Sequence, residues 1–301
     1  MKKILICDAL DADALAELEA VQNFEVVLKT GMDENALIET IPGFHAAVVR
    51  SATRITKNVI DAADVLEIVV RAGIGLDNVD VAAARDKGIQ VNNTPSATTI
   101  TVAEHTFGLM LGAVRSHGPA NLSMKAHNWE KKKFKGTELY GKTLGIIGSG
   151  RIGLAVAERG LAFGMKAVAF DIVDIDTELD VSQVPLDELL EQADIISLHL
   201  PFNASTKHMV SDAQFDKMKD GVVIVNAARG GVVDEEAMLK ALEAGKVRAA
   251  AIDVYEVEPA TNFALIDHPN VTAAPHIGAA AGEGQKRAGL EVARILKDKY
   301  L

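Results

Sequence analysis

Short apolar segments alternate with amphipathic segments along most of the chain. In the first third the apolar segments are rich in β-branched residues and predict five strands: Ile4–Cys7, Phe24–Leu28, Ala46–Val49, Ile68–Val70 and Ile89–Val91. The segments between them repeat apolar positions at helical spacing and predict helices over Ala14–Ala20, Glu34–Thr40, Lys57–Ala62 and Val79–Lys87. This alternation is typical of a parallel sheet with helices on its faces.

The alternation stops at Asn93-Thr94-Pro95. The segment Ile100–Val114 carries many small and apolar residues, and it predicts a long buried helix that crosses from one domain to the next. The following segment, His117–Tyr140, is polar and basic and lacks the periodicity of a core element. It is either a loop over its own domain or an arm that packs on a second subunit.

A second series of strands and helices begins at Lys142. Pro185 opens one of its helices, Asp234 begins another, and a final helix over about Gly282–Lys297 is long enough to return to the first domain. The predicted strands are Thr143–Ile147, Ala167–Phe170, Asp194–Leu198, Val222–Val225, Ala249–Ile252 and Val271–Ala274.

Six such strands make a complete Rossmann sheet. The predicted fold class is therefore α/β with two doubly wound parallel sheets. A flavodoxin-like domain comprises residues 1–96 and 281–301, a Rossmann domain comprises residues 97–280, and a cleft lies between the two.

Composition narrows the class of protein. The 301 residues, 49% of them hydrophobic, suffice for two cores, and the net charge of -11 argues against nucleic-acid binding. No apolar stretch is long enough to span a bilayer, and the run after Met1 is too short for a signal peptide. Cys7 is the single cysteine and cannot form an intrachain disulfide, so we expect a cytoplasmic protein.

The predicted strand Thr143–Ile147 ends in a glycine loop with the spacing G-x-G-x-x-G, followed by a helix. Gly148 permits the sharp turn, Gly150 lets a pyrophosphate come close, and Gly153 lets the helix pack on the strand. Asp171 ends the next strand about 20 residues further on, where an acid binds ribose hydroxyls and repels a 2′-phosphate. The pattern predicts an NAD site; the alternative is a tight turn without a ligand.

Arg229, Glu258 and His276 follow three successive predicted strands, at the sheet edge that also carries the glycine loop. A histidine can take the proton of an alcohol as a hydride leaves the carbon, and a neighbouring glutamate can hold its imidazole. The planar arginine fork binds a carboxylate at two points. Taken singly, His276 is typical of a loop histidine, Arg229 of a salt-bridge residue, and Glu258 with the proline after it of a turn. Together the three residues predict a site of alcohol oxidation.

Basic residues occupy matching positions in the first domain. Arg50-Ser51 and Arg71-Ala72-Gly73 each follow a predicted strand, and they point at the nicotinamide if the two domains face each other. The remaining histidines lack metal-ligand spacing, so no metal site is predicted. His199 follows the strand Asp194–Leu198, where we expect a structural role.

Several longer motifs, taken together, resemble those of a known family, the D-isomer-specific 2-hydroxyacid dehydrogenases, over essentially the whole chain. The motifs are Arg71–Asp80, Trp129–Leu139, Gly148–Gly153, Asn226–Glu235, Asp253–Pro259 and Pro275–Ala279. The segment Trp129–Leu139 resembles the branch that oxidises phosphoglycerate.

The resemblance implies that Arg229, Glu258 and His276 are catalytic, with His276 as general acid and base. It implies NAD contacts at Ile74, Gly148, Gly150, Arg151, Ile152, Gly153, Asp171, Leu200, Ala227, Ala228, Arg229, Asp253, His276, Gly278 and Ala279. It implies substrate contacts at Arg50, Ser51, Arg54, Arg71, Ala72, Gly73 and Lys131, of which Lys131 reaches the partner's site in a homodimer or a dimer of dimers.

The activity expected from the resemblance is NAD-dependent oxidation of 3-phospho-D-glycerate. Thr98 and Ala280-Ala281-Gly282 depart from the family pattern near the expected cleft, so glyoxylate, hydroxypyruvate and D-lactate stay open as substrates. A non-catalytic regulator that senses NAD(H) is a further alternative. The chain stops at Leu301, so feedback inhibition through a C-terminal serine-binding domain is not expected.

Overall fold

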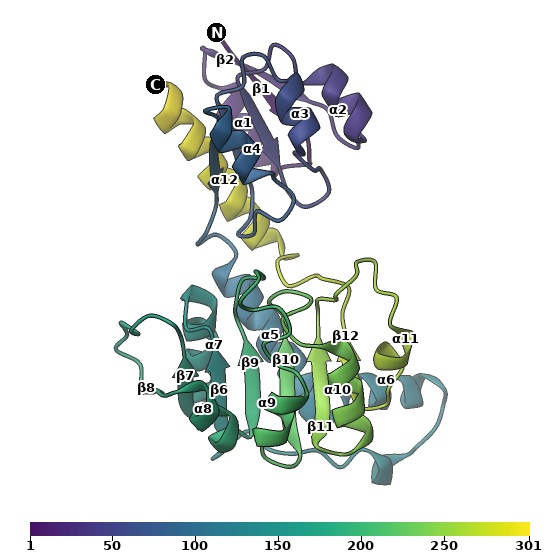
Figure 1. Ribbon diagram of the computed structural model, residues 1–301. Helices are drawn as coiled ribbons and strands as arrows, with labels where there is room; N and C mark the ends of the chain where they lie inside the picture. Colours follow the sequence, from purple (N-terminus) through teal and green to yellow (C-terminus); the bar gives the residue numbers. More distant parts are fainter. The chain divides into compact units, whose positions relative to one another are not determined.

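The computed structural model describes all residues, 1–301, and the chain divides into two compact units (Figure 1). Unit 1 comprises Met1–Thr101 and Ala279–Leu301, and unit 2 comprises Val102–Gly278. The boundaries predicted from the sequence, after residues 96 and 280, lie a few residues away from these. The chain passes between the units twice, once inside helix α5 (Thr99–Arg115) and once directly after Gly278.

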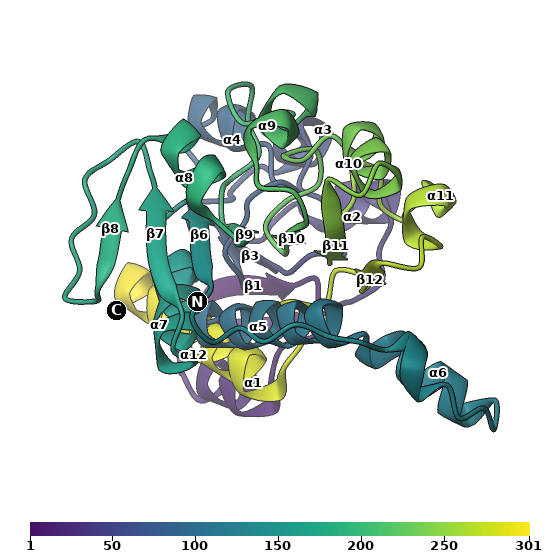
Figure 2. The ribbon, with the colours of Figure 1, turned by 90° about the horizontal axis from the view of Figure 1, so that it is seen from below.

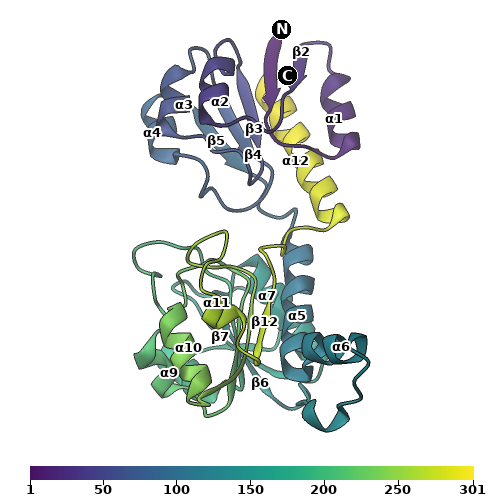
Figure 3. The same cartoon turned by 90° about the vertical axis from the view of Figure 1, so that its right-hand side faces the viewer.

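Unit 1 is built on a five-stranded parallel sheet of order β2-β1-β3-β4-β5, the flavodoxin-like order. Its strands are β1 (Lys2–Ile6), β2 (Phe24–Leu28), β3 (Ala46–Val49), β4 (Ile68–Arg71) and β5 (Gln90–Asn93). Apolar side chains of α1 (Ala12–Glu19) and α12 (Gly282–Tyr300) pack on one face. Those of α2 (Glu34–Thr40), α3 (Lys57–Ala62) and α4 (Val81–Asp86) pack on the other, where Cys7 is buried (Figure 3).

Unit 2 is built on a seven-stranded parallel sheet of order β12-β11-β10-β9-β6-β7-β8. The strand order reverses between β6 and β9, and ligands of doubly wound sheets bind at such a switch point, beyond the carboxyl ends of the strands. The strands are β6 (Thr143–Ile147), β7 (Lys166–Phe170), β8 (Val181–Gln183), β9 (Ile195–Leu198), β10 (Val222–Asn226), β11 (Val247–Ile252) and β12 (Val271–Ala273).

Helices cover both faces of the larger sheet. Helices α5 and α7 (Arg151–Ala162) pack on one face through residues such as Met110 and Val156. The other face is covered by α8 (Leu186–Gln192), α9 (Asp212–Lys217), α10 (Glu235–Glu243) and α11 (Phe263–Ile266). Figure 2 shows α5 running across the sheet. No helix of the chain combines the length and the apolar character needed to cross a membrane.

Strand β8 and helix α6 are among the elements that the sequence pattern did not predict, and the structure shifts one helix start. Strand β8 is short, half polar and at the sheet edge, so it lacks a run of buried residues. Helix α6 (His117–Lys125) lies in the segment predicted as a loop or arm, and it buries only Ser123, so it shows no apolar face in the sequence. Pro185 is the residue before α8 rather than its first helical residue.

Candidate active site

The glycine loop between β6 and α7 has the geometry that its spacing predicts. Gly148 has a φ of 93°, and a Cβ on it would lie 2.5 Å from the carbonyl oxygen of His199. A Cβ on Gly153 would collide with the carbonyl oxygen of Gly148, so the start of α7 packs directly on the loop. Only glycine therefore allows this turn and this packing.

The start of α7 fits the pyrophosphate of NAD. Gly150 precedes the helix and offers no side chain to cap it, whereas Asp234 caps α10 by accepting hydrogen bonds from two backbone N–H groups. Nothing lies within 4 Å of the position that a Cβ on Gly150 would occupy. Uncapped N–H groups beside open space are the usual anion site of a helix N-terminus.

Asp171 lies directly after β7 and is tied to the glycine loop. Its carboxylate accepts hydrogen bonds from the backbone N–H of Ser149 at 2.8 Å and from that of Ile172 at 2.7 Å. The Ser149 hydroxyl donates a further bond at 3.2 Å. This acid therefore lies next to the loop, where the ribose of a dinucleotide is expected, and Ser149 is a partner that the sequence did not reveal.

His276 and Glu258 form a hydrogen-bonded pair in the loops that follow β12 and β11. Nδ1 of His276 lies 2.8 Å from Oε2 of Glu258, and the backbone N–H of Tyr255 donates to Oε1 of the same glutamate at 3.2 Å. The two side chains are 48% and 39% exposed, so a substrate can reach them. With Nδ1 engaged, Nε2 is the ring nitrogen left to exchange a proton with a substrate.

An apolar hollow adjoins this pair. Its volume is about 640 Å³, and Tyr255, Pro259, Ile266 and Pro275 line it together with the pair itself. The hydroxyl of Tyr255 donates to the carbonyl oxygen of Ala274 at 2.9 Å. This hydroxyl is therefore satisfied within the wall of the hollow. An apolar wall lowers the local dielectric and strengthens the interaction between the imidazole and the carboxylate.

The turn that carries His276 is held by a buried carboxylate. His276 has a left-handed φ of 52°, and the next two residues, Ile277 and Gly278, donate their backbone N–H groups to Asp253 at 2.9 and 2.7 Å. Burial alone would raise the pKa of Asp253, but His105 and these two donors outweigh it and hold the pKa below its usual value. Asp253 is therefore ionised at neutral pH.

Arg229 lies in the loop after β10. The side-chain oxygen of Asn226 accepts from the N–H of Ala228 at 3.1 Å, and its amide group donates to the carbonyl oxygen of Arg229 at 3.2 Å. The Arg229 guanidinium donates to the carbonyl oxygen of Ala228 at 2.6 Å. Ala227 and Ala228 are buried. The fully buried strand end thus shapes the loop that presents the arginine.

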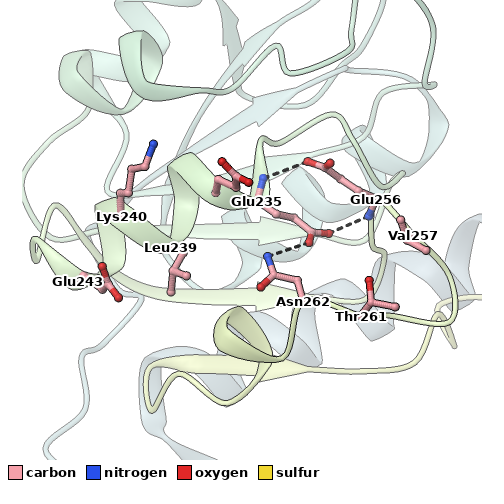
Figure 4. Close-up of a pocket in the computed structure, with 9 residues that line it drawn as sticks. Glu235, Leu239, Lys240, Glu243, Glu256, Val257, Thr261 and Asn262 are labelled. Carbon is pink, nitrogen blue, oxygen red and sulfur yellow. Dashed lines mark hydrogen bonds between the residues drawn. The ribbon is translucent and has the colours of Figure 1, made fainter.

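Reciprocal bonds tie the loop after β11 to the start of α10. Figure 4 shows Glu235 and Glu256 each accepting from the other's backbone N–H, at 2.7 and 3.1 Å. His208 adds an ion pair to Glu256 at 3.1 Å when protonated. The residues beside this pair line a pocket of about 520 Å³ that contains none of the predicted site residues. The reciprocal bonds between Glu235 and Glu256 hold the segment that leads to Glu258.

Two predicted neighbours of the loop lie beside it in unit 2. The Leu200 side chain lies next to Gly148. Partial burial lowers the pKa of His199 to about 3, and its Nε2 lies 2.8 Å from the Ser197 hydroxyl. A histidine that stays neutral in this way packs behind the glycine loop rather than taking part in proton transfer.

The residues predicted to bind substrate in unit 1 follow β3 and β4, which are neighbours in the sheet. The backbone N–H of Arg50 donates to the buried carboxylate of Asp8 at 2.5 Å, and Thr53 donates to the same carboxylate. Arg54 is exposed, and the Arg71 guanidinium packs against Gly73. The anchoring role of Asp8 is the feature here that the sequence did not show.

The remaining predicted residues lie apart from these. The carbonyl oxygen of Ile74 accepts from the amide of Asn93 at 2.5 Å. Ser51 is exposed, and Ala72 is buried. Lys131 lies in the exposed turn η1 (Lys131–Lys133).

Comparison with known proteins relates this chain to one family. The family model described as D-isomer specific 2-hydroxyacid dehydrogenase, NAD binding domain, matches residues 107–278. The chain is 47% identical to the hydroxypyruvate reductase of Thermotoga maritima, with 98% of each chain covered. It is 46% identical to the D-3-phosphoglycerate dehydrogenase of Methanocaldococcus jannaschii over 99% of this chain but 57% of that protein. The chain thus spans little more than half the length of that dehydrogenase.

Two solved structures of enzymes share this fold. A glyoxylate reductase from Paecilomyes thermophila superposes with a TM-score of 0.90 at 36% identity, covering 99% of this chain and 94% of that one. D-lactate dehydrogenase from Aquifex aeolicus, complexed with NAD and lactic acid, superposes with a TM-score of 0.87 at 29% identity, covering 98% and 95%.

Two alanine substitutions in the glycine loop separate binding from stability. We expect Gly150→Ala to weaken NADH binding about tenfold or more with an unchanged melting temperature, because its Cβ fills only the space needed by the pyrophosphate. Gly153→Ala should lower the free energy of unfolding by ~1–3 kcal/mol, because its Cβ overpacks the loop. NADH fluorescence titration and thermal unfolding measure the two effects. Wild-type NADH affinity in Gly150→Ala would contradict this model of the site.

Proposed function

The chain belongs to the D-isomer specific 2-hydroxyacid dehydrogenase family, and we propose that it oxidises 3-phospho-D-glycerate at C2 to 3-phosphooxypyruvate. This reaction is the first step of L-serine biosynthesis. The observation that supports the chemistry most directly is the accessible pair of His276 and Glu258 at adjoining strand ends, in the unit that carries the NAD loop. An NAD(H)-sensing regulator would not need this pair.

In the proposed mechanism, Nε2 of His276 accepts the proton of the C2 hydroxyl. Glu258 holds Nδ1 and stabilises the imidazolium that forms. When bound, NAD supplies the acceptor for the hydride that leaves C2. In the reverse direction the protonated His276 returns its proton to the oxygen of the 2-oxo acid, so one residue serves as base and as acid.

We assign substrate orientation to Arg229. Its guanidinium stays charged and can bind a carboxylate through two parallel hydrogen bonds while it polarises the adjoining C2 oxygen. We further propose that Arg50, Ser51, Arg54, Arg71, Ala72 and Gly73 bind the carboxylate and phosphate of the substrate. The arginines among them supply positive charge in a chain whose net charge is -11.

A second candidate substrate has specific support. The Thermotoga maritima relative that matches this chain over 98% of its own length is a hydroxypyruvate reductase, and its 47% identity is close to the 46% of the phosphoglycerate enzyme. Reduction of hydroxypyruvate uses the same pair and the same arginine. The two candidates differ in whether a phosphate contributes to binding.

Replacing His276 tests the chemistry. We expect His276→Gln to lower kcat by about 10²–10⁴-fold, because no other group takes over the proton, while NADH affinity stays nearly unchanged. His268→Gln is the control, since His268 accepts from the N–H of Asn270 and does not touch the pair. Steady-state kinetics and NADH titration provide the two measurements. Wild-type turnover in the Gln variant would rule out the assigned role.

A substrate panel tests the substrate. We expect kcat/KM for 3-phospho-D-glycerate to exceed that for D-glycerate and D-lactate, and Arg54→Gln and Arg71→Gln to reduce this preference by weakening phosphate binding. Reduction of 3-phosphooxypyruvate, hydroxypyruvate and glyoxylate is followed by NADH absorbance in the same assay. If kcat/KM for the unphosphorylated acids equals or exceeds that for the phosphorylated ones, the chain is a hydroxypyruvate or glyoxylate reductase instead.

We also propose that the chain forms a homodimer through the arm, His117–Tyr140. Figures 2 and 3 show α6 projecting from the rest of unit 2. The arm exposes large apolar side chains: Trp129 is 80% exposed, Leu122 67% and Met124 54%. Apolar surface of this kind on a projecting segment is typical of a surface covered by a second chain. Lys131 lies on the same arm, so it could reach the partner's site.

Light scattering tests the dimer. We expect the wild-type chain to have the mass of two chains or four, and Leu122→Glu combined with Trp129→Glu to have the mass of one, because the introduced charges would be buried in the interface. Lys125→Gln, on the same exposed helix, should keep the wild-type mass. A single-chain mass for the wild type would refute the proposal.

A further inference from the structure

Asp253 joins three segments of unit 2 that are far apart in the sequence. It follows β11 and is fully buried. It accepts the backbone N–H groups of Ile277 and Gly278, which directly follow His276. Its Oδ1 also lies 3.2 Å from Nε2 of His105, on helix α5.

His105 faces this carboxylate from a largely buried position, with 20% of its side chain exposed. The Nε2 atom has no well-aligned hydrogen bond, so it faces Oδ1 as a polar N–H group that is close to the carboxylate but not in line with it. No metal-ligand spacing or catalytic motif includes this histidine, and the mechanism above does not use it. Its structural setting therefore needs a separate explanation.

The position of the pair in the chain indicates what it does. Helix α5 carries the chain into unit 2 at Val102, shortly before His105, and the chain leaves the unit directly after Gly278. One buried carboxylate thus holds both ends of the unit and the turn of His276. Burying an ionised carboxylate is costly unless its oxygens are satisfied, and the polar Nε2 group of His105 beside Oδ1 adds to the two backbone donors.

We propose that His105 is a positioning residue that acts through Asp253 to hold the Ile277-Gly278 turn, and with it the left-handed backbone of His276. The proposal rests on the role of His276 given above. Without His105, the carboxylate loses its partner on α5 and the turn is held less firmly. Because proton transfer requires the imidazole within hydrogen-bond reach of the substrate, a looser turn slows turnover more than it weakens NAD binding.

The test compares three variants of the full-length chain. His105→Leu removes the polar group with little change in size, His105→Gln keeps an N–H donor near the position of Nε2, and Glu104→Gln is the matched control. Glu104 is the preceding residue on α5, is 66% exposed and pairs with Arg159 instead. Each variant is measured for kcat, KM for NAD, thermal unfolding, and hydrogen exchange of the Ile277 and Gly278 amides.

We expect His105→Leu to lower kcat by about tenfold to a hundredfold, while KM for NAD, to which Asp253 and Gly278 are predicted to contribute, rises by a smaller factor. The Ile277 and Gly278 amides should exchange faster with solvent. His105→Gln should restore most of both properties, and Glu104→Gln should resemble the wild type.

Three results would overturn the proposal: a wild-type kcat in His105→Leu, unchanged exchange of the two amides, or an equal loss of kcat in the Leu and Gln variants. The last result would show that the shape of the side chain matters rather than its donor. If the wild-type chain oxidises no 2-hydroxy acid, the proposed function fails by itself. The exchange of the two amides then still decides whether His105 holds the turn.

Discussion

The parallel arrangement of the strands in unit 2 is the constraint on which the site depends. Every pair of neighbours in the seven-stranded sheet is parallel, so all strands end at one edge and every following loop begins there. The glycine loop, Asp171, Arg229, Glu258 and His276 all follow strands of this sheet. Residues distant in the chain therefore reach one edge without any long loop.

A shared edge brings side chains close together but does not orient them. Hydrogen bonds between the loops orient them. Glu258 is held by the N–H of Tyr255, and the segment before it is tied to α10 through Glu235 and Glu256. The His276 turn is held by Asp253. In each case a carboxylate accepts from backbone N–H groups, which restricts the loop while leaving the side chains of the proposed catalytic pair exposed. Such a supporting layer keeps reacting groups in productive positions.

The sequence predicted the elements that have a strong pattern. Buried strands such as Thr143–Ile147 and Ala46–Val49 have the predicted bounds, because a continuous apolar run leaves little choice. Strand β8 and helix α6 were missed, because the first is a short edge strand and the second buries a single residue. Elements that bury little surface carry little periodicity, and their structure depends on what lies around them.

The fold class, the glycine loop and the residue types of the proposed catalytic set could be predicted from the sequence, because turn glycines and strand-end residues occupy positions set by local spacing. Which groups touch one another depends on how the elements pack in three dimensions. The bond between His276 and Glu258, the anchoring of Arg50 by Asp8, and the pairing of His105 with Asp253 join separate segments. Nothing in the spacing of eight histidines distinguishes His105. Its role becomes visible only when α5 packs beside the end of β11, because an electrostatic pairing depends on distance in space rather than along the chain.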